Sequence, residues 1–402
     1  MKVAQRLYRR AEDARPGAVE VSIVMPCLNE AETLATCIAM AREAIEKGGY
    51  SAEIIVADNG SSDGSQPLAR ELGARVVDVQ RKGYGSALIG GIDAAQGRYV
   101  VMGDADASYD FAAIGPLITK LREGYDVVVG NRFLGGIEPG AMPWSHRWVG
   151  NPVLTRISNV FFNAPVGDTH CGLRAFTKDA YERMRLRATG MEFASEMVIK
   201  ASLKRMRVTE VPVVLHPDGR SRPPHLRTWR DGWRHLRFML LFSPRWLFLY
   251  PGIGLFGVSL LIGALLETGP KKIGPFGFDI HTLLLAGFGC LIGYQLIVFA
   301  VFTKVFAMRE GFHPANPTYS AMFRYVRLET GLVLGALAFV LGTIGTVVAV
   351  LTWQSVGFGA LDPRTTMREI IPAAVLLTLG VQTIFASFFL SILGIDDESD
   401  PG

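Results

Sequence analysis

Four long apolar segments in the C-terminal part of the sequence constrain the fold of this chain more than any other feature. They run approximately over 246–266, 282–306, 332–353 and 370–393. Each exceeds the roughly 20 residues that a helix needs to cross about 30 Å of hydrocarbon. Buried helices of soluble proteins are seldom so long without a charge. The sequence therefore predicts four transmembrane helices in a membrane domain at 246–395.

The rest of the composition is consistent with this division. The chain has 402 residues, 49% of them hydrophobic, and a mean hydropathy of +0.26. The first 19 residues form a charged arm that lacks the apolar core of a secretory signal, and residues 396–402 form an acidic tail. The cysteines lack paired metal-ligand spacing, so we expect buried thiols in a reducing compartment; they are Cys27, Cys37, Cys171 and Cys290.

Between the arm and the membrane domain, strand-like and helix-like segments alternate with short links. The expected strands are 21–26, 53–57, 74–79, 98–102 and 125–129, and the expected helices are 31–47, 85–95 and 111–123. This alternation predicts an α/β domain, at 20–218, with a mostly parallel sheet covered on both faces. In such sheets, ligands bind beyond the carboxyl ends of the strands.

Polar residues follow three of these strands at that edge. They are the turn from Pro26 to Glu30, then Asp58, then the pair Asp104 and Asp106. Two carboxylates after a buried strand suit a divalent cation that keeps open positions for phosphate oxygens. An Asp-x-Asp pair by itself is common in surface turns, so the convergence of three turns supports the interpretation. We expect a nucleotide diphosphate and its metal here.

Four motifs in this order resemble those of family 2 glycosyltransferases with the Rossmann-like GT-A fold. They are Val24-Met25-Pro26-Cys27-Leu28-Asn29-Glu30, Val56-Ala57-Asp58-Asn59-Gly60-Ser61-Ser62-Asp63-Gly64-Ser65, Lys82-Gly83-Tyr84-Gly85-Ser86-Ala87-Leu88 and Gly103-Asp104-Ala105-Asp106. Within that family the chain is similar to the dolichyl-phosphate mannose synthase group of polyprenyl-phosphate glycosyltransferases. The resemblance covers roughly residues 20–250, and four ordered motifs are more specific than any one alone.

The resemblance implies a UDP- or GDP-hexose donor, Mg²⁺ or Mn²⁺, inversion at the anomeric carbon, and a polyprenyl phosphate acceptor such as undecaprenyl or dolichyl phosphate. It places the metal on Asp104 and Asp106 and a catalytic role on Asp106. The donor-binding positions that it implies are Pro26, Leu28, Glu30, Asp58, Lys82, Asp104, Ala105 and Asp106.

Two positions depart from the family pattern. The usual Asp-Asp pair after the second strand is Asp58-Asn59 here, so only Asp58 supplies a carboxylate. Ser108 stands where many members have glutamine, which predicts a metal with one protein ligand fewer.

Further candidates follow the sheet. Arg132 matches the arginine of the family's Gly-Ser/Asn-Arg motif, and Asp168 and Arg174 match its Asp-x-x-x-Gly-Phe-Arg segment. We expect Arg132 and Asp168 to be catalytic, and Arg132 and Arg174 to hold the acceptor phosphate. Glu196 is a candidate for binding donor sugar hydroxyls, with a helix-surface charge as the alternative.

The segment at 219–245 is basic and amphipathic. Gly219-Arg220-Ser221-Arg222 resembles the family's Gly-x-Ser-Lys loop, so we assign Ser221 and Arg222 to the acceptor phosphate and leave His216 open. A later stripe predicts an interfacial helix; it contains Trp229, Trp233, Leu236 and Leu240. The arginines of this helix are equally consistent with setting topology and attracting anionic lipid.

Positive charge also predicts the orientation of the chain. Basic residues cluster before the first span and between the second and third, which places both regions, and the catalytic domain, on the cytoplasmic side of the cell membrane. Lys271 and Lys272 argue mildly against this. Inside the spans, Gly289/Gly293 and Gly331/Gly335 have the spacing of close helix packing.

The kind of acceptor determines whether the reaction needs a general base. A phosphate monoester with a second pKa of about 6 is already ionised at neutral pH and needs no general base. The alternatives are transfer to a ceramide or diacylglycerol hydroxyl, and a lipid-sugar flippase with a nucleotide-sugar sensor. A processive synthase is disfavoured, because Arg245-Trp246 is preceded by Phe242 where a Gln-x-x-Arg-Trp segment needs glutamine. No nucleic-acid partner is expected, and self-association, the sugar and the base stay open.

Overall fold

A computed structural model describes residues 18–221, 228–309 and 328–394 of the chain. Arg222, the acidic tail and nearly all of the charged arm lie outside these residues. The chain forms two compact units, one ending at Met239 and the other beginning at Leu240. The division falls inside the basic segment that the sequence predicted at 219–245.

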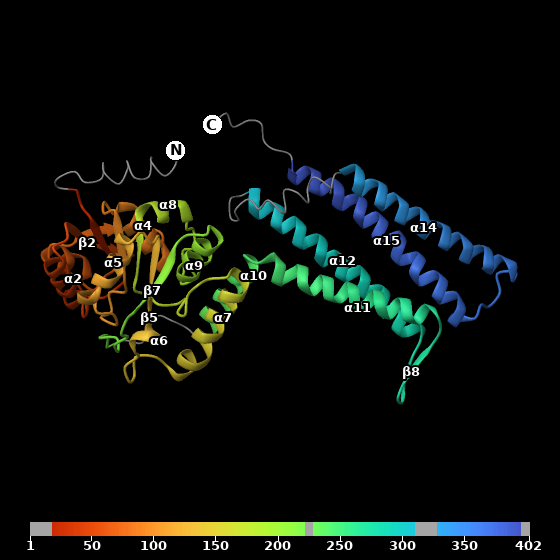
Figure 1. Cartoon of the computed structure of the whole chain (residues 1–402), viewed down its shortest axis with the longest axis horizontal. Helices are drawn as coiled ribbons and strands as arrows, with labels where there is room; N and C mark the ends of the chain where they lie inside the picture. Colours follow the sequence, from red (N-terminus) through yellow and green to blue (C-terminus); the bar gives the residue numbers. More distant parts are fainter. Residues whose placement is uncertain (1–17, 222–227, 310–327, 395–402) are drawn as a thin grey trace. The chain divides into compact units, whose positions relative to one another are not determined.

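The N-terminal unit is built on a seven-stranded sheet with the strand order β3-β2-β1-β4-β6-β5-β7. Figure 1 shows it among helices of the same unit. The strands are β1 (Val21–Cys27), β2 (Ala52–Asp58), β3 (Arg75–Asp78), β4 (Tyr99–Met102), β5 (Val127–Asn131), β6 (Arg174–Thr177) and β7 (Val208–Pro212).

The sheet is mostly parallel, as predicted. Only β6 runs antiparallel to its neighbours, β4 and β5. The register places Cys27 of β1 opposite Asp58 of β2, and Val24 of β1 opposite Met102 of β4. The carboxyl ends of these three strands therefore lie at one edge of the sheet.

Helices connect the strands with small differences from the predicted ranges. They are α2 (Leu34–Gly48), α3 (Ser65–Glu71), α4 (Tyr84–Ala94), α5 (Gly115–Arg122), α6 (Arg132–Gly135), α7 (Asn151–Phe162), α8 (Lys178–Met184), α9 (Phe193–Leu203) and α10 (Thr228–Leu241). The helix predicted at 111–123 is divided into a 3₁₀ turn, η1 (Phe111–Ala113), and α5. Pro116 sits in the first turn of α5, a position that favours starting a new helix.

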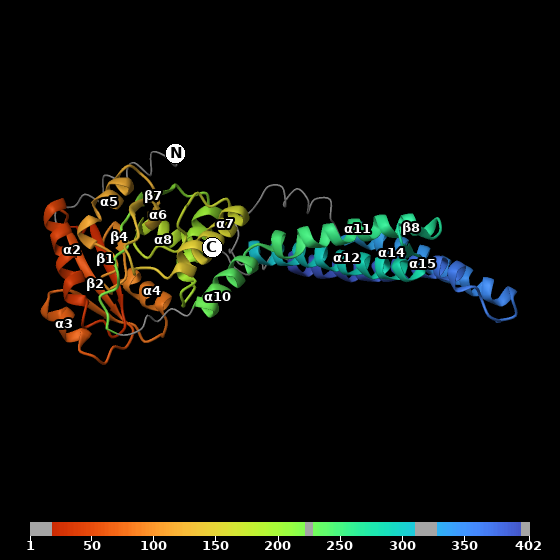
Figure 2. The same ribbon diagram turned by 90° about the horizontal axis from the view of Figure 1, so that it is seen from below.

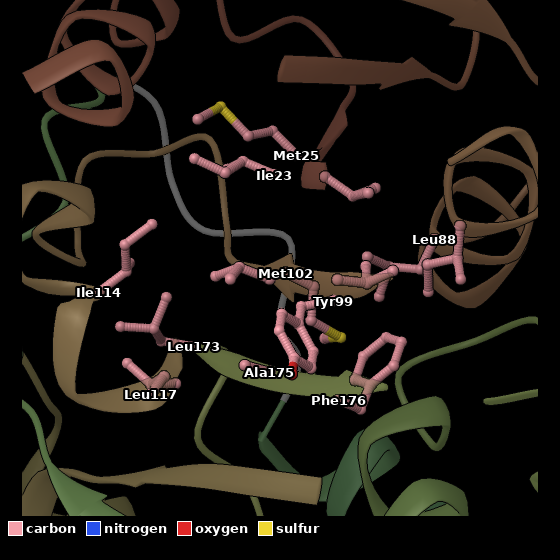
Figure 3. Close-up of a cluster of buried hydrophobic side chains, with 14 of the residues drawn as sticks. Ile23, Met25, Leu88, Tyr99, Met102, Ile114, Leu117, Leu173, Ala175 and Phe176 are labelled. Carbon is pink, nitrogen blue, oxygen red and sulfur yellow. The ribbon is translucent and has the colours of Figure 1, made fainter. Parts of the chain in front are cut away.

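The core of this unit lies between the sheet and its helices. Figure 3 shows part of it, where Leu88 from α4 and Leu117 from α5 gather with Met102, Ala175 and Phe176 from the strands. All five side chains are buried. This apolar packing fixes the strand ends, and with them the polar turns that follow.

The C-terminal unit contains four helices that are long and apolar enough to cross a membrane. The π-helical turn η3 (Arg245–Leu249) leads into α11 (Tyr250–Glu267), and a small hairpin of β8 (Lys271–Ile273) and β9 (Phe276–Phe278) precedes the second span. The remaining spans are α12 (Ile280–Arg309), α14 (Leu328–Ser355) and α15 (Pro363–Gly394). The four spans predicted from the sequence are confirmed.

Glycines allow these helices to pack closely. Figure 2 shows the four spans running alongside one another. A Cβ on Gly293 of α12 would lie 2.5 Å from the backbone nitrogen of Phe256 on α11, and one on Gly335 of α14 would lie 2.9 Å from the carbonyl oxygen of Gly380 on α15. The glycine spacing therefore does permit close approach of helix backbones, as the sequence predicted.

Candidate active site

The turns after β1 and β2 are tied together by short hydrogen bonds. The amide of Asn29 donates to the hydroxyl of Ser61 at 2.8 Å, and the amide of Glu30 donates to that of Ser65 at 3.0 Å. The turn after β4 joins them, because the hydroxyl of Thr33 donates to the carbonyl of Ala105 at 2.6 Å. The three turns that the sequence singled out thus meet at one edge of the sheet.

Asp58 is a buried, ionised acceptor at this edge. Its Oδ1 accepts from the amides of Gly60 and Ser61 at 2.9 and 3.0 Å and from the side chain of Gln66 at 2.7 Å. Burial opposes the charge, but hydrogen bonds from Ser61, Gln66 and Gly60 outweigh it and lower the pKa of Asp58. Its Oδ2 is buried without a hydrogen-bond partner among the described residues, so this oxygen can accept a bond from a ligand.

Asn59 explains the departure from the usual Asp-Asp pair. Its side-chain amide donates to the carbonyls of Val79 and Arg81 at 2.9 and 2.8 Å, while its side-chain oxygen accepts from the amide of Gly83 at 2.8 Å. A carboxylate could not make the two donated bonds. Lys82 donates to the backbone carbonyl of Asn59 at 2.7 Å, which also holds this loop beside Asp58.

Asp104 is partly buried where β4 ends. The phenol of Tyr84 donates to its Oδ1 at 2.8 Å. Burial, together with the charge of Asp106, raises the pKa of Asp104 to about 7, although the hydrogen bond from Tyr84 and the charge of Arg220 act in the opposite direction. An additional cation nearby would favour the ionised form of this carboxyl group.

A turn at Ala107, with a φ of 60°, follows the two carboxylates. Asp106 Oδ1 accepts from the amide of Ser108 at 3.0 Å and from its hydroxyl at 2.5 Å. Ser108 therefore orients Asp106 in this structure. The position where many members have glutamine thus supports the carboxylate from within the same turn.

Arg220 places a positive charge among the acidic residues of this edge. Its guanidinium donates to Asp106 Oδ2 at 2.9 Å and to Glu30 Oε1 at 3.3 Å, and it also pairs with Asp218 at 2.9 Å. Its side chain is only 12% exposed. Sequence reasoning assigned Ser221 and Arg222 and missed Arg220, which fills the variable position of the Gly-x-Ser-Lys motif.

The carboxylates of Asp104 and Asp106 fit a hard divalent cation that takes most of its oxygen ligands from a bound ligand or from water. Within residues 18–221, 228–309 and 328–394, no group of three or more His, Cys, Asp or Glu side chains is arranged to hold a metal. The protein offers Asp104 and Asp106, and the guanidinium of Arg220 shows that positive charge is favourable beside Asp106. Such a pair suits a cation that shares its coordination with phosphate oxygens.

Arg132 and Asp168 form a buried ion pair. Arg132 donates to Asp168 through Nε at 2.6 Å and through Nη2 at 2.8 Å, and its backbone amide adds a bond of 3.2 Å. Asp168 is fully buried and Arg132 is 7% exposed. Two of the three residues predicted to be catalytic are thus brought together, and each fixes the orientation of the other.

Arg174 has a different role from the predicted one. It is fully buried, and its guanidinium donates to the carbonyls of Cys171 at 2.8 Å and of Thr169 and Ala194 at 2.6 Å. These bonds commit its donors to the backbone. In this structure Arg174 therefore shapes the loop after Asp168 and does not present a guanidinium to an acceptor phosphate.

Glu196 also differs from the prediction. Its Oε2 accepts from the amides of Arg187 and Ala188 at 2.9 and 2.8 Å, and its Oε1 pairs with Lys200 at 2.7 Å. Both oxygens are thus used inside the protein. Glu196 therefore holds the loop at 187–190, where the carbonyl oxygen of Thr189 would lie only 2.2 Å from a Cβ on Gly83.

The remaining predicted residues lie around this edge. Pro26 and Ala105 are buried, and Leu28 is 36% exposed. The amide and hydroxyl of Ser221 donate to Glu32 at 2.8 and 2.6 Å, next to Arg220. The His216 ring lies 2.9 Å from Glu138, and the backbone amide of His216 donates to the carbonyl of Ser108 at 3.0 Å.

A group of polar residues, of which Ser195 and His235 are buried, lies next to Asp168. Ser195 Oγ is 2.8 Å from Nδ1 of His235 on α10, and the rings of His235 and His170 meet edge to face at 4.7 Å. The backbone amide of His170 donates to Asp168 Oδ1 at 3.3 Å. Sequence reasoning did not foresee this group, because its members come from three separate segments of the chain.

Two sequence profiles match the chain. The one described as "Glycosyl transferase family 2" matches residues 22–185, and "Glycosyltransferase family 2 C-terminal transmembrane region" matches residues 301–394. Among solved structures, glucosyl-3-phosphoglycerate synthase from Mycobacterium tuberculosis, in complex with Mn²⁺, UDP and glucosyl-3-phosphoglycerate, covers 56% of this chain and 78% of its own. The TM-score is 0.43 and the identity is 23%.

Curated relatives match more of the chain. The low-salt glycan biosynthesis hexosyltransferase Agl6 of Haloferax volcanii is 38% identical over 94% of this chain and 90% of its own length. Glycosyltransferase AglJ of the same organism is 30% identical over 71% and 93%. A dolichyl-phosphate hexose transferase of that organism is 30% identical over 48% of this chain and 82% of its own. The chain therefore belongs to glycosyltransferase family 2, as a membrane protein of that family.

Proposed function

We propose that this glycosyltransferase moves a hexose from a nucleotide-diphosphate sugar to a polyprenyl phosphate. The observation that carries the proposal is the acidic edge itself, where Asp104 and Asp106 follow β4 and a guanidinium already pairs with Asp106. A relative named as a dolichyl-phosphate hexose transferase supports the choice of acceptor. The four apolar helices support it as well, because they hold the chain in the membrane that contains such lipids.

Asp104 and Asp106 would hold Mg²⁺ or Mn²⁺ together with the donor. When bound, the cation would offset negative charge on the departing diphosphate. Ser108 keeps Asp106 oriented for this role, and Tyr84 does the same for Asp104. These supporting bonds reduce the rearrangement that ligand binding would require.

The turns after β1 and β2 would bind the nucleotide. The unpartnered Oδ2 of Asp58 would accept a hydrogen bond from an N–H of the base or an O–H of the ribose. Asn59 and Lys82 shape the loop beside it. Glu30, Pro26 and Leu28 would complete this side of the nucleotide site.

The acceptor would attack as an ionised phosphate. One of its oxygens forms a bond to the anomeric carbon while the bond from that carbon to the nucleotide diphosphate breaks, and this single displacement inverts the configuration. No proton has to be removed, because the monoester is already an anion at neutral pH. Arg220, Ser221, Arg222 and Arg132 supply the cationic and polar groups that would orient it, and Asp168 fixes Arg132.

Transfer to a ceramide or diacylglycerol hydroxyl is the nearest alternative, since the donor half of the site would look the same. That reaction would require a general base to take the hydroxyl proton. A flippase with a nucleotide-sugar sensor would bind the donor without consuming it. The proposal further places catalysis on the cytoplasmic side of the cell membrane, where nucleotide sugars are made available.

The test is a panel of UDP- and GDP-sugars incubated with the full chain in nanodiscs, with Mn²⁺ or Mg²⁺ and undecaprenyl or dolichyl phosphate. The expected result is release of nucleotide diphosphate that requires both the metal and the lipid phosphate. Equal release with diacylglycerol or ceramide would show that the acceptor is a lipid hydroxyl and not a polyprenyl phosphate. Donor binding without any release would favour the flippase.

A further inference from the structure

We propose that the exposed face of η2 (His146–Gly150) and α7 in the N-terminal unit is a lipid-docking surface that rests in the headgroup region of the bilayer. This α7 face is defined as Trp144, Trp148, Val149, Val153, Arg156 and Val160. The inference goes beyond the sugar-transfer proposal, because it concerns how the catalytic unit meets the membrane and does not depend on the donor or the metal.

The exposure of large apolar side chains carries the proposal. Trp144 is 71% exposed and Trp148 is 63% exposed, while Val149, Val153 and Val160 are each about half exposed, at 49%, 49% and 50%. Soluble surfaces seldom carry such a continuous apolar patch without a partner. In a unit joined to transmembrane helices, the interfacial region of the bilayer is available as that partner.

The spacing of these residues follows one side of a helix. Positions 144, 148, 153, 156 and 160 recur at three to five residues, so their side chains lie along one side of the segment. The opposite side is buried and contains Thr155, Ser158 and Phe162. The helix is therefore amphipathic, but its outward side is the apolar one.

The chemistry of the α7 face matches a lipid headgroup layer more closely than a dry protein interface. Tryptophan is enriched at the membrane–water boundary, where its ring is partly apolar and its N–H stays in contact with polar groups. Arginine belongs there as well, because it attracts lipid phosphates. Arg147 stands over the ring of Trp148 at 5.6 Å, and Arg156 is exposed on the face itself.

The adjacent helix α10 repeats the pattern. Its Asp231, His235 and Met239 are buried, whereas Trp229 is 91% exposed and Trp233 is 57% exposed. Asp231, His235 and Met239 thus face the protein, and the outward side carries these tryptophans together with Arg230 and Arg234, which are 51% and 45% exposed. In the sequence, α10 is followed directly by η3 and the first apolar span. Only a few residues of the chain therefore separate α10 from the first membrane-spanning helix.

All of α7, and α10 as far as Met239, belong to the same unit, and the two helices lie near each other in Figures 1 and 2. Their inner sides contact one loop. On α7, Thr155 Oγ1 accepts from the amide of Thr169 at 3.3 Å, and Asn159 donates to the carbonyl of Val166 at 2.8 Å. On α10, the His235 ring meets that of His170.

This loop carries Asp168, which fixes Arg132. Seating the α7 face in the headgroup layer would therefore hold the Arg132–Asp168 pair at a defined distance from lipid phosphates. A long-chain acceptor, which cannot leave the bilayer, would gain from that placement. A water-soluble acceptor would not.

Spin-label accessibility on the full chain in nanodiscs tests the proposal. Val149→Cys, Val153→Cys and Val160→Cys would each be labelled, and Glu123→Cys, at the exposed residue that follows α5, serves as the control. The native thiols are buried, which directs the label to the introduced cysteine. We expect the three α7 labels to collide with O₂ in preference to Ni(II)EDDA, several-fold more than the control label.

Two results would overturn the docking surface. Collision with Ni(II)EDDA at the level of the Glu123→Cys control would place the α7 face in water. Protection from both reagents would place it against protein, such as a second copy of the chain. Neither result would affect metal-dependent release of nucleotide, so this proposal and the proposed function fail separately.

A second measurement uses activity. The double variant Trp144→Ser/Trp148→Ser should raise the KM for a long-chain polyprenyl phosphate in nanodiscs several-fold, with kcat and the KM for a short, water-soluble prenyl phosphate unchanged. The conservative variant Trp144→Phe/Trp148→Phe should restore the low KM. Equal loss with both acceptors would indicate a merely structural role and would contradict the proposal.

Discussion

The guanidinium of Arg220 donates to Asp106 Oδ2 at 2.9 Å. It thereby occupies an oxygen of one of the two carboxylates that we propose for the metal, and Glu30 and Asp218 hold it there. In this structure, Arg220 thus supplies beside Asp106 a positive charge of the kind that a bound metal would bring. A metal that binds Asp106 has to compete with this ion pair.

Removal of this competitor predicts tighter metal binding. The variant Arg220→Gln should bind Mn²⁺ about tenfold more strongly than the native chain in the absence of donor, which corresponds to about 1.4 kcal/mol. Isothermal titration calorimetry measures this directly. Unchanged or weaker binding would show that Arg220 does not compete for Asp106.

Removal of the carboxylate predicts loss of transfer. Asp106→Asn should lower kcat by about 10²-fold or more, because several kcal/mol of charge stabilisation would be lost. Asp110→Asn is a matched control, since Asp110 caps η1 through a bond to the amide of Ala112 at 2.8 Å. The control should retain activity, and both variants should keep the circular dichroism of the native chain. Substantial activity in Asp106→Asn would remove this residue from the mechanism.

Asn59 predicts a stability effect from a change of one atom. Asn59→Asp would replace the amide that donates to Val79 and Arg81 by an oxygen that repels their carbonyls. We expect a loss of about 1–3 kcal/mol in the unfolding free energy, the usual result of leaving buried polar groups unmatched. Thermal unfolding of the native chain and the variant measures it, with the exposed Ser62→Ala as the control. An Asn59→Asp variant as stable as the native chain would contradict the assigned role of the amide.

His235 predicts that acid weakens the attachment of α10. Burial is the main reason that the pKa of His235 is lowered to about 4, with the charge of Arg174 acting in the same direction and those of Glu192 and Asp231 against it. The folded unit therefore favours the neutral ring. The stability that this ring contributes is present above the ordinary pKa of 6.5 and is lost as the pH falls toward about 4.

Amide hydrogen exchange in α10 measures this effect. After correction for intrinsic exchange rates, protection should fall between about pH 6.5 and about pH 4. The variant His235→Gln keeps a side chain that can bond Ser195 but removes the titration, so its protection should depend less on pH. The same acid dependence in both proteins would exclude His235 as its source.

Much of the edge could be predicted because it depends on local sequence. The strands before Asp58 and Asp104 are short apolar runs that end in polar turns, and parallel pairing brings such ends together. The bond from Thr33 to the carbonyl of Ala105 confirms that they converge. The four spans were equally readable, because their length and composition alone define them.

The roles of Arg174 and Glu196 could not be predicted in the same way. Both bond mainly to backbone groups of loops that are close by in the chain, and any residue type supplies such groups. The strand β6, which begins at Arg174, is short and antiparallel, so the alternation of strands and helices does not reveal it. The carboxylates with which Arg220 pairs could not be predicted either, because Glu30 and Asp106 are far from Arg220 in the sequence and meet it only in the folded chain.

The most direct test of the central claim is the release of nucleotide diphosphate by the full chain in nanodiscs, measured with and without divalent metal and with and without polyprenyl phosphate. The account predicts release only when the metal and the lipid phosphate are both present, together with one inverted sugar phosphate product per nucleotide. Release that continues at the same rate after removal of either one would contradict it.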